Sequence, residues 1–235
     1  MASSARAIMP NVHRIHYRFG IVLSLILVTI TFTLAAPEGD GARFLAVMLQ
    51  ALVLVAAVIA SRAHRAVILF SVVAAVLGLL GTALALFGSD QFGNSSAAIV
   101  ALFYVMLTPP AIVTGLMKQF RDAGAVTMQT MFGVLCLYLL IGLLFSVAFV
   151  TIDQVSSTPF FTAAGMHGRD DFLYFSYTTL TTVGYGDLVA ATNLGRSLAI
   201  TEALTGQLYL VSVVAVIISN LRPAQPRPRR KDRTT

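Results

Sequence analysis

The chain contains 235 residues, of which 57% are hydrophobic and only 11% are charged. A soluble domain carries about 25% charged residues, so this composition excludes an ordinary soluble enzyme and indicates a membrane protein. The formal net charge of +6 is compatible with nucleic-acid binding, but basic segments beside membrane spans typically contact anionic lipid headgroups instead. We therefore expect lipids at a basic inner face and no nucleic-acid partner.

Six apolar runs are long enough to cross the hydrocarbon core, which takes about 20 residues in a helix. They predict an all-α membrane protein with six transmembrane helices. The single cysteine, Cys136, lies inside the fifth run, and we expect it to be a small buried apolar side chain. The runs lie at residues 17–36, 44–60, 66–87, 97–117, 126–150 and 193–221.

Basic and acidic residues fall on alternate connections between these runs. The N-terminal residues up to Arg18 at the start of the first run, the second-to-third and fourth-to-fifth connections and the segment after the sixth run hold 13 of the 16 Lys and Arg residues. The positive-inside rule makes these connections, and both termini, cytoplasmic. The remaining connections carry seven of the ten acids. We expect an integral protein of the plasma or inner membrane.

The first run has an alternative interpretation. A basic leader, an apolar stretch and Leu34-Ala35-Ala36 before Pro37 resemble a signal peptide with a small-residue cleavage site. Cleavage would leave five spans without altering their orientation. We favour a retained first span, because the apolar stretch is at the long end for a signal sequence.

The fourth run lacks the charges of a voltage sensor, which needs arginines at every third position of a membrane helix. Ala97–Met117 contains no Arg or Lys until Lys118 at its inner end. Its Pro109-Pro110 pair removes two backbone donors and predicts a kink. Voltage sensing through charges on this helix is therefore not expected.

The sequence pattern changes near Lys118–Gly124, from four apolar runs to a run, a polar stretch and a second run. This change divides the chain into modules. We predict a cytoplasmic N-terminal segment, a four-helix transmembrane module without sensor arginines, a pore domain, and a disordered, basic, proline-rich cytoplasmic tail. These modules cover residues 1–16, 17–121, 122–221 and 222–235, respectively.

The polar stretch between the last two runs contains a short predicted helix. Asp170-Asp171 opens it, and we expect these acids to cap its first turn. Phe172–Leu180 is too short to span, so the helix should enter the membrane and return, surrounded by protein or a water-filled cavity. Thr181–Asp187 follows, with the sequence TTVGYGD. Its glycines tolerate positive φ angles, which suits a loop whose carbonyls all face a hard monovalent cation.

A span, a short helix, Thr-Thr-Val-Gly-Tyr-Gly-Asp and a second span together resemble the tetrameric potassium channels over residues 126–221. The resemblance implies a homotetramer that conducts K⁺ through rings of backbone carbonyls, with K⁺ as the permeant ion and no cofactor. It places K⁺ at the carbonyls of four residues, with the Thr182 hydroxyl innermost. Gly184 and Gly186 would permit the alternating backbone handedness. The four residues are Thr182, Val183, Gly184 and Tyr185.

The same resemblance assigns residues that support the filter. The Tyr185 ring would brace the loop against the aromatic residues of the short helix, and Asp187 would form hydrogen bonds behind it. Tyr174-Phe175 stands where many members have paired tryptophans. Thr178 stands where some members place an acid that pairs with the filter aspartate. The filter-supporting residues are therefore Tyr174, Thr178, Thr181 and Asp187.

The sixth run carries the predicted hinge and gate. Gly206 follows Gly186 by twenty residues, where the inner helix of the family has its hinge glycine. Glu202 is the one acid inside a span, where a charge is costly unless it is paired or neutral. We leave open a proton-sensitive switch and a protonated structural residue. Gln207, Leu210, Val214 and Ile218 recur at helical spacing and would face the pore, with Val214 and Ile218 as the candidate gate.

These features predict a potassium-selective channel that is not an enzyme and has no catalytic residues, because no span or loop brings together a nucleophile and a base. Two other functions remain open. A potassium-uptake subunit would carry four degenerate pore repeats in one chain, whereas this chain has one intact repeat. A membrane sensor or scaffold would use the pore domain only to oligomerise.

Overall fold

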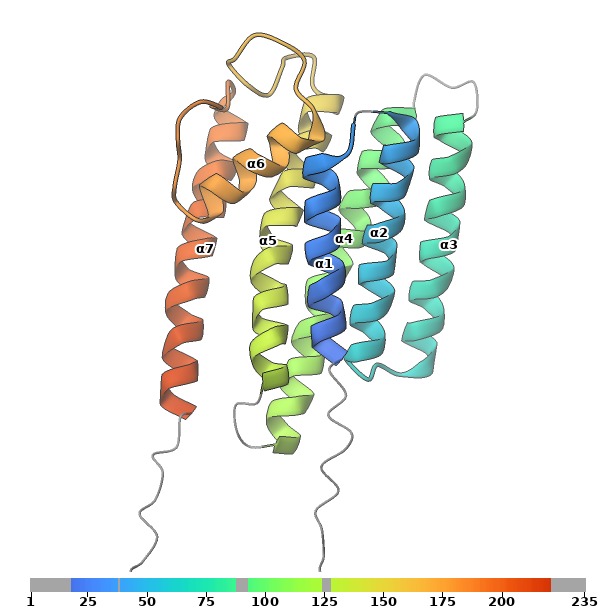
Figure 1. Ribbon diagram of the computed structural model, residues 1–235, viewed down its shortest axis with the longest axis vertical. Coiled ribbons are helices and arrows are strands. Elements are labelled where there is room, and N and C mark those ends of the chain that lie inside the picture. Colours follow the sequence, from blue (N-terminus) through green and yellow to red (C-terminus); the bar gives the residue numbers. More distant parts are fainter. Residues whose placement is uncertain (1–17, 38, 88–92, 124–127, 221–235) are drawn as a thin grey trace, which may run out of the picture.

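The computed structural model describes residues 18–37, 39–87, 93–123 and 128–220, and within them seven helices. The predicted N-terminal segment and the basic tail lie outside these residues. Figure 1 shows α1 to α5 standing side by side along their lengths, with α3 and α7 at opposite ends of the molecule. The helices are α1 (Arg18–Ala35), α2 (Asp40–Ala60), α3 (Arg65–Phe87), α4 (Gly93–Ala123), α5 (Met128–Val155), α6 (Arg169–Leu180) and α7 (Asn193–Asn220).

Five of these helices are long and apolar enough to cross a membrane, as the sequence predicts for the first five runs. They are α1, α2, α3, α4 and α5, and the apolar windows match the predicted spans to within a few residues. α7 covers 28 residues at the position of the sixth run but is not among the five. Its role as a sixth span therefore stays a prediction.

α4 is a continuous helix that includes the proline pair. Pro109 and Pro110 both lie inside it. The Thr108 hydroxyl, immediately before them, donates a hydrogen bond to the Tyr104 carbonyl at 2.8 Å. Back-bonding of this kind slightly bends helices, and the kink at the prolines stays a prediction.

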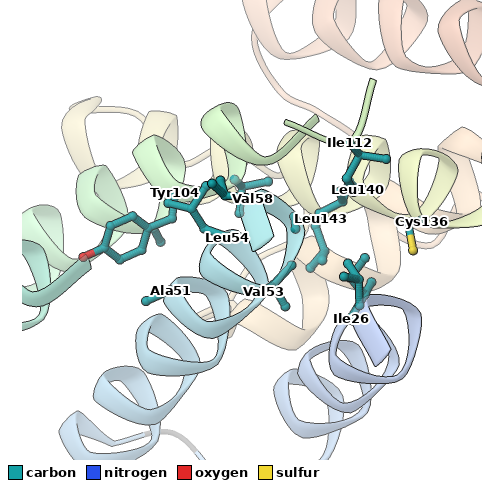
Figure 2. Packing of buried hydrophobic residues seen from close by; sticks show 14 of the residues in the cluster. Ile26, Ala51, Val53, Leu54, Val58, Tyr104, Ile112, Cys136, Leu140 and Leu143 are labelled. Carbon is teal, nitrogen blue, oxygen red and sulfur yellow. The ribbon is translucent and has the colours of Figure 1, made fainter. Parts of the chain in front are cut away.

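The main hydrophobic core joins the first four helices to α5. Side chains of α1, α2, α4 and α5 meet in it, as Figure 2 shows for Ile26, Leu54, Ile112 and Leu140, all at most 1% exposed. Cys136 belongs to this core and is fully buried, as expected. Leu173 of α6 belongs to it as well. One core therefore connects the four-helix region to the short helix.

α1 packs against helices that are distant in the sequence as well as against its neighbour α2. The distant helices are α5 and α6. Near its start, the Phe19 amide donates to the Gln129 side-chain oxygen at 3.1 Å, and the Cys136 thiol contacts the Phe19 carbonyl at 3.6 Å. The first helix is thus built onto the outer helix of the predicted pore domain.

Candidate functional site

α6 is a short helix of 12 residues held mainly by apolar contacts. It lies across the ends of α5 and α7 in Figure 1 and packs against α5, α7 and α1. Phe172, Leu173 and Leu180 are at most 2% exposed. A helix of this length cannot cross a bilayer, so its buried face fixes the position of the residues that follow it.

The predicted capping of α6 by its acids is wrong. Asp170 and Asp171 lie in the first turn, but the N-cap residue is Gly168, and no side chain caps the helix. The Asp171 carboxylate instead lies 2.9 Å from Nδ1 of His167. This partner, in the loop before the helix, takes the carboxylate away from the backbone amides. The acids still occupy the helix end that favours negative charge.

The TTVGYGD loop begins by folding back onto the C-terminal end of α6. The Thr182 amide donates to the Thr179 carbonyl at 2.9 Å. The Thr178 carbonyl accepts from the amides of both Val183, at 2.8 Å, and Gly184, at 3.2 Å. A helix leaves its last carbonyls without partners in the helix, so these bonds tie the loop to the end of α6.

Positive φ angles occur at every second residue of this loop. They are 60° at Thr182, 52° at Gly184 and 81° at Gly186. The two glycines adopt this conformation at little cost, whereas a residue with a Cβ such as Thr182 rarely does. A backbone that alternates in handedness turns successive carbonyls toward the same side of the chain. The loop conformation is thus of the kind that a carbonyl-lined ion path requires.

Two tyrosines and an aspartate hold the outer part of the loop. The rings of Tyr174 and Tyr185 are stacked, with centroids 6.3 Å apart and an angle of 2° between their planes. The Asp187 carboxylate also lies close enough to the Tyr174 side chain to act on it electrostatically. Tyr174 therefore neighbours two of the residues that the sequence assigns to the filter and its support.

The two predicted threonine supports bond within their own helix. The Thr178 hydroxyl donates to the Phe175 carbonyl at 3.0 Å, and the Thr181 hydroxyl donates to the Tyr177 carbonyl at 2.6 Å. Both hydroxyls therefore bond to backbone carbonyls, and neither of these bonds involves Asp187. Thr178 holds the loop through its backbone carbonyl, which accepts hydrogen bonds from Val183 and Gly184.

A phenylalanine cluster behind α6 was not predicted. Phe160 and Phe161, in the α5–α6 loop, pack against Phe172 and Phe175 of α6, with ring centroids 4.8–5.9 Å apart. The Asp153 carboxylate accepts a hydrogen bond from the Phe160 amide at 2.8 Å. The sequence signal for this cluster was the apolar pair Phe160-Phe161 in an otherwise polar loop.

The same loop is joined to the segment after the filter. The Ala191 amide donates to the Phe160 carbonyl at 2.8 Å, and the Thr162 amide donates to the Val189 carbonyl at 2.9 Å. Nε of Arg196, in α7, donates to the Ala190 carbonyl at 3.0 Å. The chain on both sides of the TTVGYGD loop is therefore fixed to one aromatic cluster.

The α7 residues assigned to the hinge lie directly against α6 and the filter. A Cβ placed on Gly206 would be 2.5 Å from the Leu180 carbonyl oxygen, so the absence of a side chain permits this contact. The Gln207 amide nitrogen is 3.4 Å from the Thr182 hydroxyl. Val214 and Ile218 belong to α7, but their side chains are outside the described part of the structure.

Glu202 is fully buried and links α7 to the other pore helices. Its Oε1 is 2.5 Å from the Ser176 hydroxyl of α6. That hydroxyl also lies 2.7 Å from the Gly142 carbonyl of α5. Oε2 has no hydrogen-bond partner. The structure thus places Glu202 at the meeting point of three helices, rather than in solvent.

His167 gives the loop before α6 a predicted pH dependence. Its hydrogen bond to Asp171 raises the pKa of the imidazole above the usual 6.5; the Ala163 carbonyl adds to this and partial burial opposes it. A raised pKa contributes stability that is full below about pH 6.5 and is lost as pH rises through the raised value. Wild type should therefore lose more thermal stability than His167→Gln between about pH 6 and about pH 9.

Unfolding midpoints of both proteins over this range test the prediction. His64→Gln is the control, because His64 is exposed in the turn between α2 and α3. A stability difference between wild type and His167→Gln that does not change with pH would contradict the assignment.

Comparison with known proteins gives a family match to this region and a similar relative. A family model described as Ion channel matches residues 154–222. The potassium voltage-gated channel subfamily A member 5 of Rattus norvegicus is 34% identical over 85 residues. The match covers 34% of this chain and 14% of that relative. No solved structure gives a significant match.

Residues 154–222 are thus similar to the ion channel family. They contain α6, the TTVGYGD loop and α7, which are the elements described above. Together with the similarity to a potassium channel, this match supports a place in the potassium channel family, as the sequence motif predicts. With its five apolar helices, the chain has the character of an integral membrane protein.

Proposed function

We propose that this protein is a potassium-selective channel that conducts K⁺ passively as a homotetramer. K⁺ would bind in turn to the carbonyls of residues 182–185, with α6 as a re-entrant pore helix and α7 as the sixth span. The observation that carries the proposal is the alternation of positive φ angles along the TTVGYGD loop at the end of a buried short helix. A ring of such carbonyls replaces the water shell of K⁺.

The exposure of the loop supports assembly into a multimer. All residues from Thr181 to Asp187 are exposed in the single chain, with Val183 at 52% and Tyr185 at 72%. Irregular backbone at membrane depth requires surrounding protein or a water-filled cavity. Additional copies of the chain around a shared axis would supply both. Leu204, Leu208 and Val211 give α7 an exposed apolar surface for the same assembly.

Gating by charge movement in α4 is not part of the proposal. The relative from Rattus norvegicus is named as voltage-gated, but the apolar window of α4, Ala97–Lys118, contains no arginine. A voltage sensor needs several charges within the field. The orientation proposed from the basic connections places the TTVGYGD loop outside and both termini inside the cell.

Ion flux in liposomes tests the function. We expect the purified protein to carry K⁺ in preference to Na⁺ and only down its concentration gradient. Gly184→Ala should abolish the flux, because the new Cβ is strained at a φ of 52°. Gly165→Ala is the matched control, since Gly165 also has a positive φ, 133°, and, like Gly184, has nothing within 4 Å of an added Cβ, but it lies in the α5–α6 loop. That variant should retain the K⁺ flux.

The same assay distinguishes the other two functions. K⁺ movement against its concentration gradient, or at the slow turnover of a carrier, would favour an uptake subunit, and no K⁺ flux in the wild type would favour a sensor or scaffold. Equal flux in Gly184→Ala and the wild type would exclude the loop as the ion path.

A further inference from the structure

A cavity lies between the four-helix region and the short helix, at the end of the molecule that carries the α5–α6 loop. About 50 Å³ of it is room for water-sized groups, within about 560 Å³ of space that includes the open mouth, and it is lined by residues of α1, α2, α4, α5 and α6. Apolar side chains such as Val47, Val147 and Leu173 form much of its wall. A mainly apolar wall that carries a few polar groups is typical of ligand sites, and the parts of an occupant too large for the enclosed space would lie in the open mouth.

Two glutamines place unpaired acceptors at this cavity. Gln50 lines it and is only 7% exposed, yet its Oε1 has no hydrogen-bond partner. Oε1 of Gln154 also lines the cavity, is buried and has no partner. Buried polar atoms in native proteins are nearly always paired. Two orphaned oxygens in one cavity therefore indicate an occupant that donates hydrogen bonds.

Two arginines give the same wall a positive charge. Arg43 and Arg169 both line the cavity. The Arg43 guanidinium also lies 3.2 Å from the Asp40 carboxylate, which is 54% exposed and does not itself line the cavity. Guanidinium groups bind phosphate through parallel hydrogen bonds. The occupant should therefore carry an anionic group as well as hydrogen-bond donors.

We propose that this cavity binds an anionic glycerophospholipid whose headgroup bears hydroxyls. The phosphate would accept hydrogen bonds from the two arginines, the hydroxyls would donate to the two glutamine oxygens, and an acyl chain would lie along the apolar wall. A lipid fits better than a free phosphate ester, because four of the lining helices are apolar enough to lie in the bilayer. Leu173 and Arg169 belong to α6, so the occupant would contact the short helix directly.

Binding is measurable without any channel activity. The full-length protein is purified in a zwitterionic detergent and titrated with phosphatidylglycerol or phosphatidylcholine in mixed micelles. Native mass spectrometry counts the bound lipids, and the unfolding midpoint reports stabilisation. We expect phosphatidylglycerol to bind the wild type at least tenfold more tightly than phosphatidylcholine and to raise its midpoint.

Gln50→Leu separates ligand binding from a structural role of the glutamine. Leucine is similar in size and removes a buried acceptor, so the lipid-free variant should be at least as stable as the lipid-free wild type. Its affinity for phosphatidylglycerol should nevertheless fall about tenfold. Ala98→Phe, which adds a ring to the cavity wall, should lower the number of bound lipids. Arg65→Gln is the control, because it removes one positive charge from the start of α3, outside the cavity.

Three results would overturn the proposal. Equal binding of phosphatidylcholine would mean that the cavity recognises only acyl chains. Equal stabilisation by soluble glycerol 3-phosphate would mean that it takes a free phosphate ester. Unchanged phosphatidylglycerol binding in both Gln50→Leu and Ala98→Phe, or an equal loss in Arg65→Gln, would mean that lipid binds elsewhere.

Discussion

Gly206→Ala should abolish K⁺ flux and lower the thermal stability of the protein. The new Cβ would lie 2.5 Å from the Leu180 carbonyl oxygen and 2.8 Å from its Cδ1. Leu180 is 1% exposed and ends α6, one residue before the TTVGYGD loop. A backbone oxygen in this position cannot move alone, so α7 must shift away from the base of the filter. Overpacking of this kind typically costs about 1–3 kcal/mol.

Helix propensity acts in the opposite direction and supplies the control. Replacing glycine by alanine inside a helix is worth about 1 kcal/mol when nothing obstructs the methyl group. Gly81, inside α3, has no atom within 4 Å of an added Cβ. Gly81→Ala should therefore keep full flux and unfold at the same or a higher temperature, whereas Gly206→Ala should unfold lower.

The comparison also separates two roles of Gly206. If its only role were that of a flexible hinge, alanine would change how often the channel opens, but not the stability of the closed protein. Close packing against Leu180 requires a loss of stability as well. Thermal unfolding of both variants in detergent, alongside K⁺ flux in liposomes, distinguishes these cases. An unfolding midpoint for Gly206→Ala equal to or above that of wild type would contradict the packing role.

The sequence predicts the helices well because the membrane restricts the choices. In a bilayer every backbone polar group must be paired within the protein, so an apolar run of about 20 residues has little option but to form a helix. The predicted start of the sixth run, residue 193, is where α7 begins. The short helix was also predicted, opening at Asp170, one residue after its observed start at Arg169.

Side-chain partners outside the regular helical pattern were not predictable. His167 takes the carboxylate that was expected to cap α6, and only the folded loop brings the two together. Phe160 and Phe161 meet α6 because the loop is paired with the segment after the filter. The packing of α1 against α5 and α6 also leaves no trace in composition or periodicity. Hydrophobic patterning identifies which face of a helix is buried, but not which neighbour buries it.

Ser176→Ala should destabilise the protein by about 1–3 kcal/mol, although it removes a single oxygen atom. The Ser176 hydroxyl has one proton but lies within hydrogen-bond distance of two acceptors, the Gly142 carbonyl and Oε1 of Glu202. Both contacts are satisfied if Ser176 donates to the carbonyl and a protonated Glu202 donates to Ser176. Alanine would then leave a fully buried carboxyl group without a partner.

Replacing the acid itself should have a much smaller effect. In Glu202→Leu, Ser176 still donates to Gly142 and no buried polar atom is orphaned, so stability should change by less than about 1 kcal/mol. Glu202→Gln should also be tolerated, because the side-chain amide can donate to the Ser176 oxygen. The double variant Ser176→Ala with Glu202→Leu should recover most of the stability lost in Ser176→Ala. Unfolding free energies of the four proteins form a double-mutant cycle that measures this coupling.

The properties of Glu202→Gln distinguish a structural acid from a proton-sensitive switch. A carboxyl group that stays protonated between three helices predicts the same pH profile of K⁺ flux in wild type and Glu202→Gln. It also predicts an infrared band of a protonated carboxyl group that disappears in the glutamine variant. A pH dependence of flux that is present in wild type and absent in Glu202→Gln would instead show that Glu202 ionises during gating. In that case the charge would form on Oε2, which has no hydrogen-bond partner. α7 would then have to move away from Ser176 to expose the charged carboxylate.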